Sequence, residues 1–151
     1  MFSLVRLVRR SLIRRGLIAP RIFVGCALTH APEGFKNQVN WLKLQLKRNG
    51  WEVLEFLGLK VGTAKDVYEW DILKCVGRCD FLVAVCDYAS IGLGYELATA
   101  TEKHEIWVLA VAHADADISR LPQGVTHRRY SFARYRDLGE VESFIKDIIE
   151  N

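Results

Sequence analysis

Short apolar runs alternate with amphipathic segments after Pro20, and this alternation constrains the fold more than any other feature of the chain. We expect strands at residues 22–28, 51–57, 81–86, 106–112 and around 129–132. We expect helices at residues 35–49, 65–78, about 95–103 and 138–149. Strands that alternate with helices favour right-handed βαβ units, which build a parallel sheet covered by helices on both faces. The predicted fold class is therefore α/β, a three-layer doubly wound sheet of about five mainly parallel strands, flavodoxin-like or Rossmann-like.

The composition fits a single domain of this kind. The chain has 151 residues, of which 50% are hydrophobic and 26% are charged. A domain of this size buries roughly 68–70% of the surface that its unfolded chain exposes, so a core can form without disulfides or a structural metal. The composition excludes disordered, collagen-like and disulfide-scaffold proteins. No apolar run approaches the ~18 residues that a membrane span needs.

The cysteines form no recognisable ligand pattern. Cys75 and Cys79 lie one helical turn apart without a nearby His, and Cys26 and Cys86 stand alone. We expect all four to be small buried hydrophobic side chains in a reducing interior. No metal ion and no cofactor is predicted.

The positive charge is concentrated at the N-terminus. The first 21 residues contain six Arg and no acidic residue, so the other 15 cationic side chains face all 18 acids in residues 22–151, a net charge of −3. Residues 1–20 are predicted to form a basic amphipathic extension, ahead of an α/β domain at 21–151. The extension could be an interfacial anchor at a membrane surface, a transit peptide, a nucleic-acid contact or an upstream translation start. We expect a cytoplasmic protein, with organelle targeting left open.

Ligands of open parallel sheets bind at the carboxyl ends of the strands, where loops lead into helices. Three segments meet this description, at residues 25–34, 58–71 and 87–96. We therefore expect the functional site among them.

The segment from Ser90 to Glu96 follows a buried strand and opens a helix. Gly92 and Gly94 would allow a ligand close to the backbone, so the loop could cradle a phosphate or a ribose. It is neither a dinucleotide fingerprint, because Leu97 occupies the third glycine position, nor a P-loop. The alternative is that the glycines pack the helix against the sheet. Glu96, in the first turn of that helix, should be kept ionised by the helix dipole and would suit a nucleophile at an anomeric carbon.

A second carboxylate would be needed as acid or base, and the helix at 65–78 supplies candidates. Asp71 lies one turn from Val67 and one from Cys75, so it should face inward, whereas Asp66 and Glu69 should lie closer to solvent. The alternative for each is a solvated helix face. Tyr68 flanks Asp71 and could stack on a nucleobase.

Residues 71–100 resemble the signature of the nucleoside 2-deoxyribosyltransferase family and its relatives, the 2′-deoxynucleoside 5′-monophosphate N-glycosidases. The shared features are a helix Asp, an apolar strand after Cys-Asp, and Ser-x-Gly-x-Gly-Tyr-Glu opening a helix. The resemblance implies that Glu96 is the nucleophile that captures C1′ and that Asp71 assists departure of the base. It also implies a nucleoside or nucleotide substrate and a homodimer or higher homo-oligomer.

The same resemblance assigns the binding residues. Ser90 and Gly92 would contact the 5′ side of the sugar or its phosphate, and Gly25 would line the same pocket. Ser119 is similar to a serine that reaches a neighbouring subunit's site. The chain departs from the monophosphate hydrolases at two positions, with Ile22 where they carry an aromatic hydroxyl and Leu28 where they carry Arg. Thr29 and His30 are the pocket donors that it offers instead.

The predicted function is an N-glycosidic-bond enzyme that transfers or hydrolyses a (deoxy)ribosyl group. Two alternatives stay open: a non-catalytic nucleotide-sensing module on the same fold, or a relative that cleaves NAD. His113, Asp115 and Asp117 could be metal ligands, but a polar loop explains them better. Residues 128–136 interleave Arg with aromatics, as nucleic-acid binders do, yet an edge strand and the net −3 argue against that partner.

Overall fold

The computed structural model describes residues 20–56 and 62–151. The predicted N-terminal basic helix lies outside these residues, as does most of the predicted loop at 58–64. The elements follow in this order: β1 (Arg21–Cys26), α2 (Glu33–Arg48), β2 (Glu52–Leu54), α3 (Ala64–Tyr68), the π-helix η1 (Glu69–Val76), β3 (Phe81–Val85), α4 (Ile91–Ala98), the π-helix η2 (Thr99–Lys103), β4 (Trp107–His113), the 3₁₀-helix η3 (Leu121–Gln123), β5 (Tyr130–Tyr135), the 3₁₀-helix η4 (Leu138–Glu140) and α5 (Val141–Glu150).

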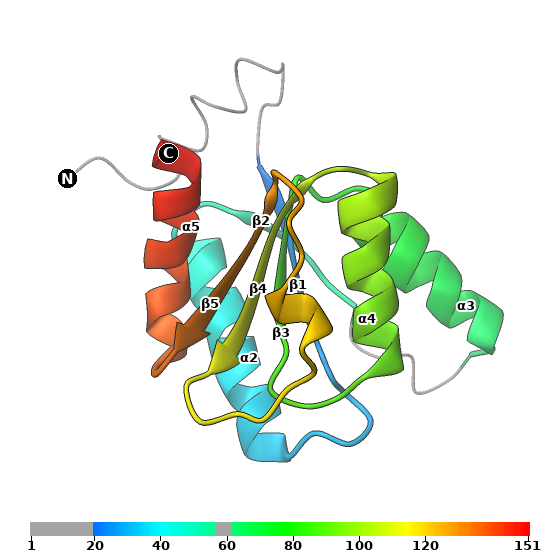
Figure 1. Ribbon diagram of the computed structural model, residues 1–151. Helices are drawn as coiled ribbons and strands as arrows, with labels where there is room; N and C mark the ends of the chain where they lie inside the picture. The colour runs from blue at the N-terminus through cyan, green and yellow to red at the C-terminus, as the bar shows by residue number, and fades with distance from the viewer. Residues whose placement is uncertain (1–19, 57–61) are drawn as a thin grey trace.

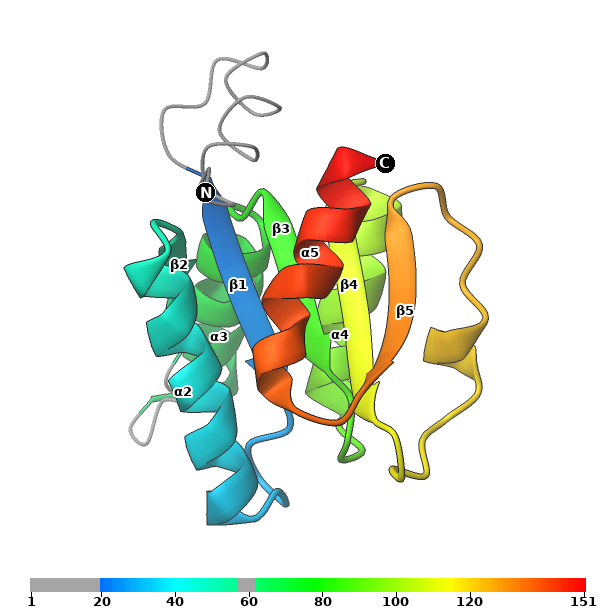
Figure 2. The same cartoon turned by 90° about the vertical axis from the view of Figure 1, so that its left-hand side faces the viewer.

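The five strands form one parallel sheet in the order β2-β1-β3-β4-β5, which confirms the predicted fold class. Helices α2 and α5 cover one face of the sheet, while α3 and α4 cover the other (Figures 1 and 2). The chain reverses its winding between β1 and β3, so the loops that follow these two strands diverge at the carboxyl edge. This is the place where doubly wound sheets bind ligands.

Two hydrophobic clusters, one on each face, hold the layers together. Successive side chains of β1 point to opposite faces of the sheet and so belong to different clusters. Ile22 and Val24 pack under α2 and α5, while Phe23 packs on the opposite face. All five residues of β3 are buried, as expected for a central parallel strand. Cys75, Cys79 and Cys86 are buried among these side chains, as predicted, whereas Cys26 is half-buried at the end of β1.

The helix predicted at 65–78 differs from expectation in its inward face. The apolar spacing of the sequence predicts an inward face that includes Trp70 and Leu73, but these side chains are 43% and 48% exposed. From Glu69 onward the helix is π-helical, so each turn takes up more residues than an α-turn and the buried stripe shifts. The inward side chains are instead Asp71, Ile72, Cys75 and Val76.

Three other boundaries also differ. The strand predicted at 51–57 is only three residues long and pairs with Arg21–Phe23, so the carboxyl-terminal half of β1 has no neighbour from β2. The helix predicted to begin near Tyr95 begins at Ile91, because the Ser90 hydroxyl caps it by accepting a hydrogen bond from the Leu93 N–H at 3.2 Å. The final strand runs to Tyr135, three residues beyond the predicted end. None of the helices in the described part of the chain is both long and apolar enough to cross a membrane.

Candidate active site

The loops after β1 and β3 enclose a cavity at the carboxyl edge of the sheet. Its volume is about 360 Å³, and four of the predicted binding residues line it, namely Thr29, His30, Ser90 and Gly92. Thr29 and His30 are exposed at its rim, and Ser90 closes the N-terminus of α4. The structure thus brings together residues that lie 60 positions apart in the sequence.

Two carboxyl groups meet between α4 and η1, and neither of them lines this cavity. Glu96 from α4 and Asp71 from η1 are only 6% and 7% exposed, and they hydrogen-bond to each other. A hydrogen bond between two carboxyl groups requires that one of them carry the proton. Asp71 Oδ1 and Glu96 Oε2 are buried and have no other hydrogen-bond partner within residues 20–56 and 62–151. Buried oxygens left in this state are costly, which makes the pair a candidate functional site.

Glu96 differs from expectation in its ionisation. It is the sixth residue of α4, beyond the first turn in which the helix dipole acts. Burial raises the pKa of Glu96 strongly, and the hydrogen bond and negative charge of Asp71 raise it further. Burial also raises the pKa of Asp71, while the hydrogen bond from Glu96 acts in the opposite direction. The raised pKa of Glu96 means that the pair retains a proton at neutral pH.

Gly25 lies directly against the Glu96 carboxyl. A Cβ placed at position 25 would collide with Glu96 Oε2 and come within 3.1 Å of Leu93 Cδ1. Only glycine lets α4 bring its carboxyl this close to the backbone of β1. Gly25 and Glu96 therefore lie side by side, although neither lines the 360 Å³ cavity.

A buried lysine that the sequence analysis did not single out lies next to the pair. Lys43 on α2 is buried, and its Nζ lies 3.7 Å from Glu55 Oε2. Its positive charge acts on Glu96 against burial and Asp71, lowering the pKa. The sequence contained a signal, because Lys43 continues the apolar stripe of Val39, Leu42 and Leu46 on α2. A lysine on such a stripe is expected to be buried and paired with an acidic side chain.

The other predicted residues have different surroundings. Gly94 and Ser119 line a second cavity of about 370 Å³. Ser90 lines it as well, so Ser119 lies near Ser90 within one chain. Tyr68 is exposed on α3, and neither cavity includes it. Asp66 forms a capping box with Thr63, whose backbone N–H donates to it at 2.8 Å and lowers its pKa. Asp66 therefore has a structural role.

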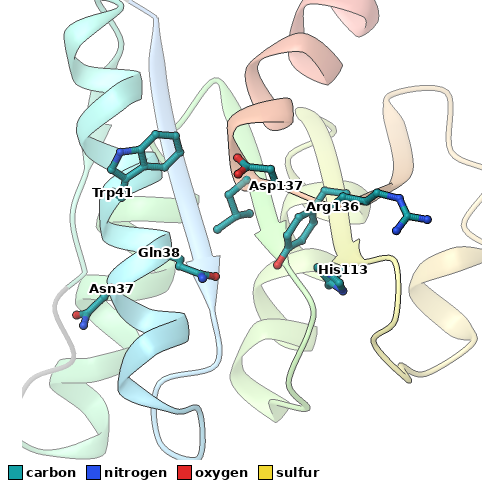
Figure 3. A pocket seen from close by; sticks show the side chains of 8 residues that line it. Asn37, Gln38, Trp41, His113, Arg136 and Asp137 are labelled. Carbon is teal, nitrogen blue, oxygen red and sulfur yellow. The ribbon is translucent and has the colours of Figure 1, made fainter.

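A third cavity, of about 440 Å³, lies between α2 and the ends of β4 and β5 (Figure 3). Trp41 and Gln38 border it from α2, and His113 and Asp137 border it from the other side. His113 accepts a hydrogen bond from the Asp115 N–H at 3.1 Å. In the described residues, no three His, Cys, Asp or Glu side chains come together as metal ligands, and the His113–Asp117 segment is a polar turn.

The fold and the site define an α/β protein with a buried carboxyl pair at the switch point of its sheet. No protein-family model and no curated protein sequence matches the chain. Among solved structures, Clostridium botulinum CMP N-glycosidase, BcmB, is similar, with a TM-score of 0.65 at 20% identity over 83% of this chain and 97% of that one. Francisella novicida lysine decarboxylase LdcF is also similar, with a TM-score of 0.53 at 15% identity over 89% of this chain but only 18% of that one. At these identities the likeness shows the fold alone.

Gly25→Ala should destabilise the protein by about 1–3 kcal/mol, because the new methyl group forces the Glu96 carboxyl and Leu93 to move. Urea unfolding measures the change. The matched control is Gly34→Ala in the first turn of α2, where no atom would lie within 4 Å of the added Cβ. That variant should be neutral or more stable by up to about 1 kcal/mol. Equal stability of both variants would contradict the close approach of Glu96 to β1.

Glu96→Gln should be more stable than the wild type at pH 8, on the order of 2 kcal/mol, with an advantage that disappears near pH 4. The folded-state pKa of Glu96 is raised above its unfolded value. The protonated Glu96 carboxyl therefore contributes its full stability to the wild type below the ordinary carboxyl pKa, and this contribution is lost as the pH rises through the raised pKa. Thermal unfolding from pH 4 to 8 measures the difference. Glu102→Gln, at an exposed carboxyl on η2, should stay within about 0.5 kcal/mol of the wild type throughout.

Proposed function

We propose that this protein breaks the N-glycosidic bond of a nucleoside or nucleotide through a covalent glycosyl intermediate on Glu96. The observation that carries the proposal is the buried Glu96–Asp71 carboxyl pair, in which Glu96 belongs to the helix that Ser90 caps. The sequence signature at residues 71–100 and the fold shared with a CMP N-glycosidase support it. Hydrolysis and transfer differ only in whether water or a second base resolves the intermediate.

The shared proton accounts for both halves of the reaction. Glu96 cannot attack while it is protonated, and Asp71 is its hydrogen-bond partner. When the proton moves through Asp71 to the leaving base, the C1′–N bond breaks and its electron pair stays on the base nitrogen. Glu96, now a carboxylate, forms the new bond to C1′. In the second step Asp71 accepts a proton from water, or from an incoming base, as that acceptor attacks C1′ and releases Glu96.

The surroundings favour this division of roles. The positive charge of Lys43 favours the ionised form of Glu96, as the attack requires. The cavity between the loops that follow β1 and β3 presents hydroxyl and imidazole groups from Thr29, His30 and Ser90. These groups suit the 5′ side of a sugar, with or without a phosphate. We propose a small-molecule nucleoside or nucleotide as substrate and place the reaction in the cytoplasm.

We also propose that the protein acts as a homodimer or higher homo-oligomer. Ile91 and Leu121 are 96% and 80% exposed, and both border the cavity that contains Ser119. Large apolar side chains this exposed are typical of contacts with another subunit. A second copy seated there would lie next to Ser90.

A second candidate is a nucleotide-binding module without turnover. Two observations favour it: Glu96 is protonated in the free protein, and Ile22 and Leu28 replace the aromatic hydroxyl and Arg of the monophosphate hydrolases. A nucleotide that raises the melting temperature without any release of base would support this candidate, because a ligand that binds only the folded state stabilises it.

Glu96→Gln should reduce base release by roughly 10³-fold or more, because it removes the nucleophile. Asp71→Asn should reduce it strongly for ordinary bases and only slightly for an activated base that leaves without a proton. The assay separates free base by chromatography after incubation with deoxynucleosides, ribonucleosides, their 5′-monophosphates and NAD. Glu69→Gln, on the same π-helix but paired with Lys65 at the surface, is the control and should keep full activity. Full base release by Glu96→Gln would disprove the mechanism.

The pH profile of kcat should be bell-shaped, because the reaction needs a pair that holds one proton. Below the lower pKa of the pair, both carboxyls are protonated and no nucleophile forms. Above the raised pKa of Glu96, the proton for the base is lost. In Asp71→Asn the alkaline limb should disappear when an activated base is used. A wild-type activity that rises steadily with pH to a plateau would contradict the shared-proton scheme.

A further inference from the structure

Asp87 lies in the segment that connects β3 to α4, and its carboxylate is hydrogen-bonded to the ends of β4 and β5. Its Oδ1 accepts a hydrogen bond from the backbone N–H of His113 at 3.0 Å, where β4 ends. Its Oδ2 accepts one from the Tyr135 hydroxyl at 2.6 Å, where β5 ends. Both carboxylate oxygens of a half-buried side chain are thus used by groups outside its own loop.

The rest of the loop is held from other sides. The ring of Tyr88 packs edge-on against Phe35 on α2, with centroids 4.9 Å apart. Ser90 caps α4 and lines both cavities at the carboxyl edge. Asp87 therefore fixes the start of a four-residue segment whose other end presents Ser90 to the substrate and leads into the helix that carries Glu96.

Tyr135 is built to hold Asp87 rather than to face solvent. It is buried on the edge strand, and its ring packs edge-on against His113 with centroids 5.5 Å apart. Burial raises the pKa of Tyr135, and the hydrogen bond to Asp87 raises it further, so the hydroxyl stays a donor. Hydrogen bonds to a charged acceptor are about twice as strong as neutral ones. His113 and Tyr135 also line the third cavity (Figure 3), which makes the same strand ends part of its wall.

We infer that Asp87 and Tyr135 are positioning residues that hold the Ser90 loop in its substrate-binding position and so determine the affinity for substrate. The inference rests on the proposed function for its effect on substrate affinity, but not for its effect on the loop. Neither residue touches the carboxyl pair in this arrangement. Their effect reaches the substrate through the Asp87–Ser90 segment.

The first experiment needs no substrate. In Tyr135→Phe, amide hydrogen exchange at residues 87–93 should speed up by about tenfold, the effect of losing one charged hydrogen bond, while exchange in α5 stays unchanged. Tyr130→Phe is the matched control, since Tyr130 is buried on the same strand and its hydroxyl donates to the Pro122 carbonyl at 2.6 Å. That variant should speed up exchange around Pro122 and leave residues 87–93 unchanged. Unaltered exchange at 87–93 in Tyr135→Phe would overturn the inference.

The second experiment uses the nucleotide substrate found in the base-release assay. Tyr135→Phe should raise KM by about tenfold while kcat changes less than threefold, because binding outside the reacting atoms is lost. Asp87→Ala should do the same, and the double variant should be no worse than Asp87→Ala, because Tyr135 acts through Asp87. Additive effects, or a loss confined to kcat, would overturn the inference. Asp87→Asn, which keeps an acceptor oxygen, should recover part of the affinity. If the wild type releases no base, the proposed function fails while the exchange experiment still decides the inference.

Discussion

The buried contact between the Glu96 and Asp71 carboxyls is the interaction on which the arrangement of the site depends. Two carboxyl groups can be buried in contact only if one of them is protonated, because two adjacent negative charges repel each other. The surrounding elements bring the two groups into this contact. Asp71 faces inward from η1, and the absence of a side chain at Gly25 lets Glu96 approach β1. Lys43 adds a nearby positive charge.

Magnitudes explain why burial, and not the helix dipole, decides the state of Glu96. A helix N-terminus stabilises a nearby carboxylate by roughly 0.3–1 kcal/mol, and the effect fades after the first turn. Removing a carboxylate from water costs several kcal/mol even after the protein relaxes. With Glu96 in the second turn and nearly inaccessible, the second effect is larger and the proton stays. The expectation of an ionised Glu96 was wrong because it weighed the helix position without the burial.

The sequence was sufficient for the fold class, because short continuous apolar runs such as the one at 81–86, alternating with amphipathic segments, are typical of central parallel strands. It was also sufficient to identify Glu96 and Asp71 as candidate site residues. Glycines before an acid, and an acid spaced one helical turn from apolar residues, are local patterns. It could not give the inward face of η1, because π-winding is set by packing and not by periodicity. Nor could it give the contacts of Asp87, because a hydrogen bond spanning 48 residues leaves no local pattern.

The fold by itself does not decide the chemistry, since it is shared with a CMP N-glycosidase and with part of a lysine decarboxylase. The functional argument therefore stands on features that a merely structural domain would avoid. Two buried carboxyls with unsatisfied oxygens reduce stability as pH rises, and a neutral replacement at position 96 would relieve that cost. The glycine placed against one of them and the hydrogen bonds from two further strands to Asp87 support the proposal that the pair acts on a ligand.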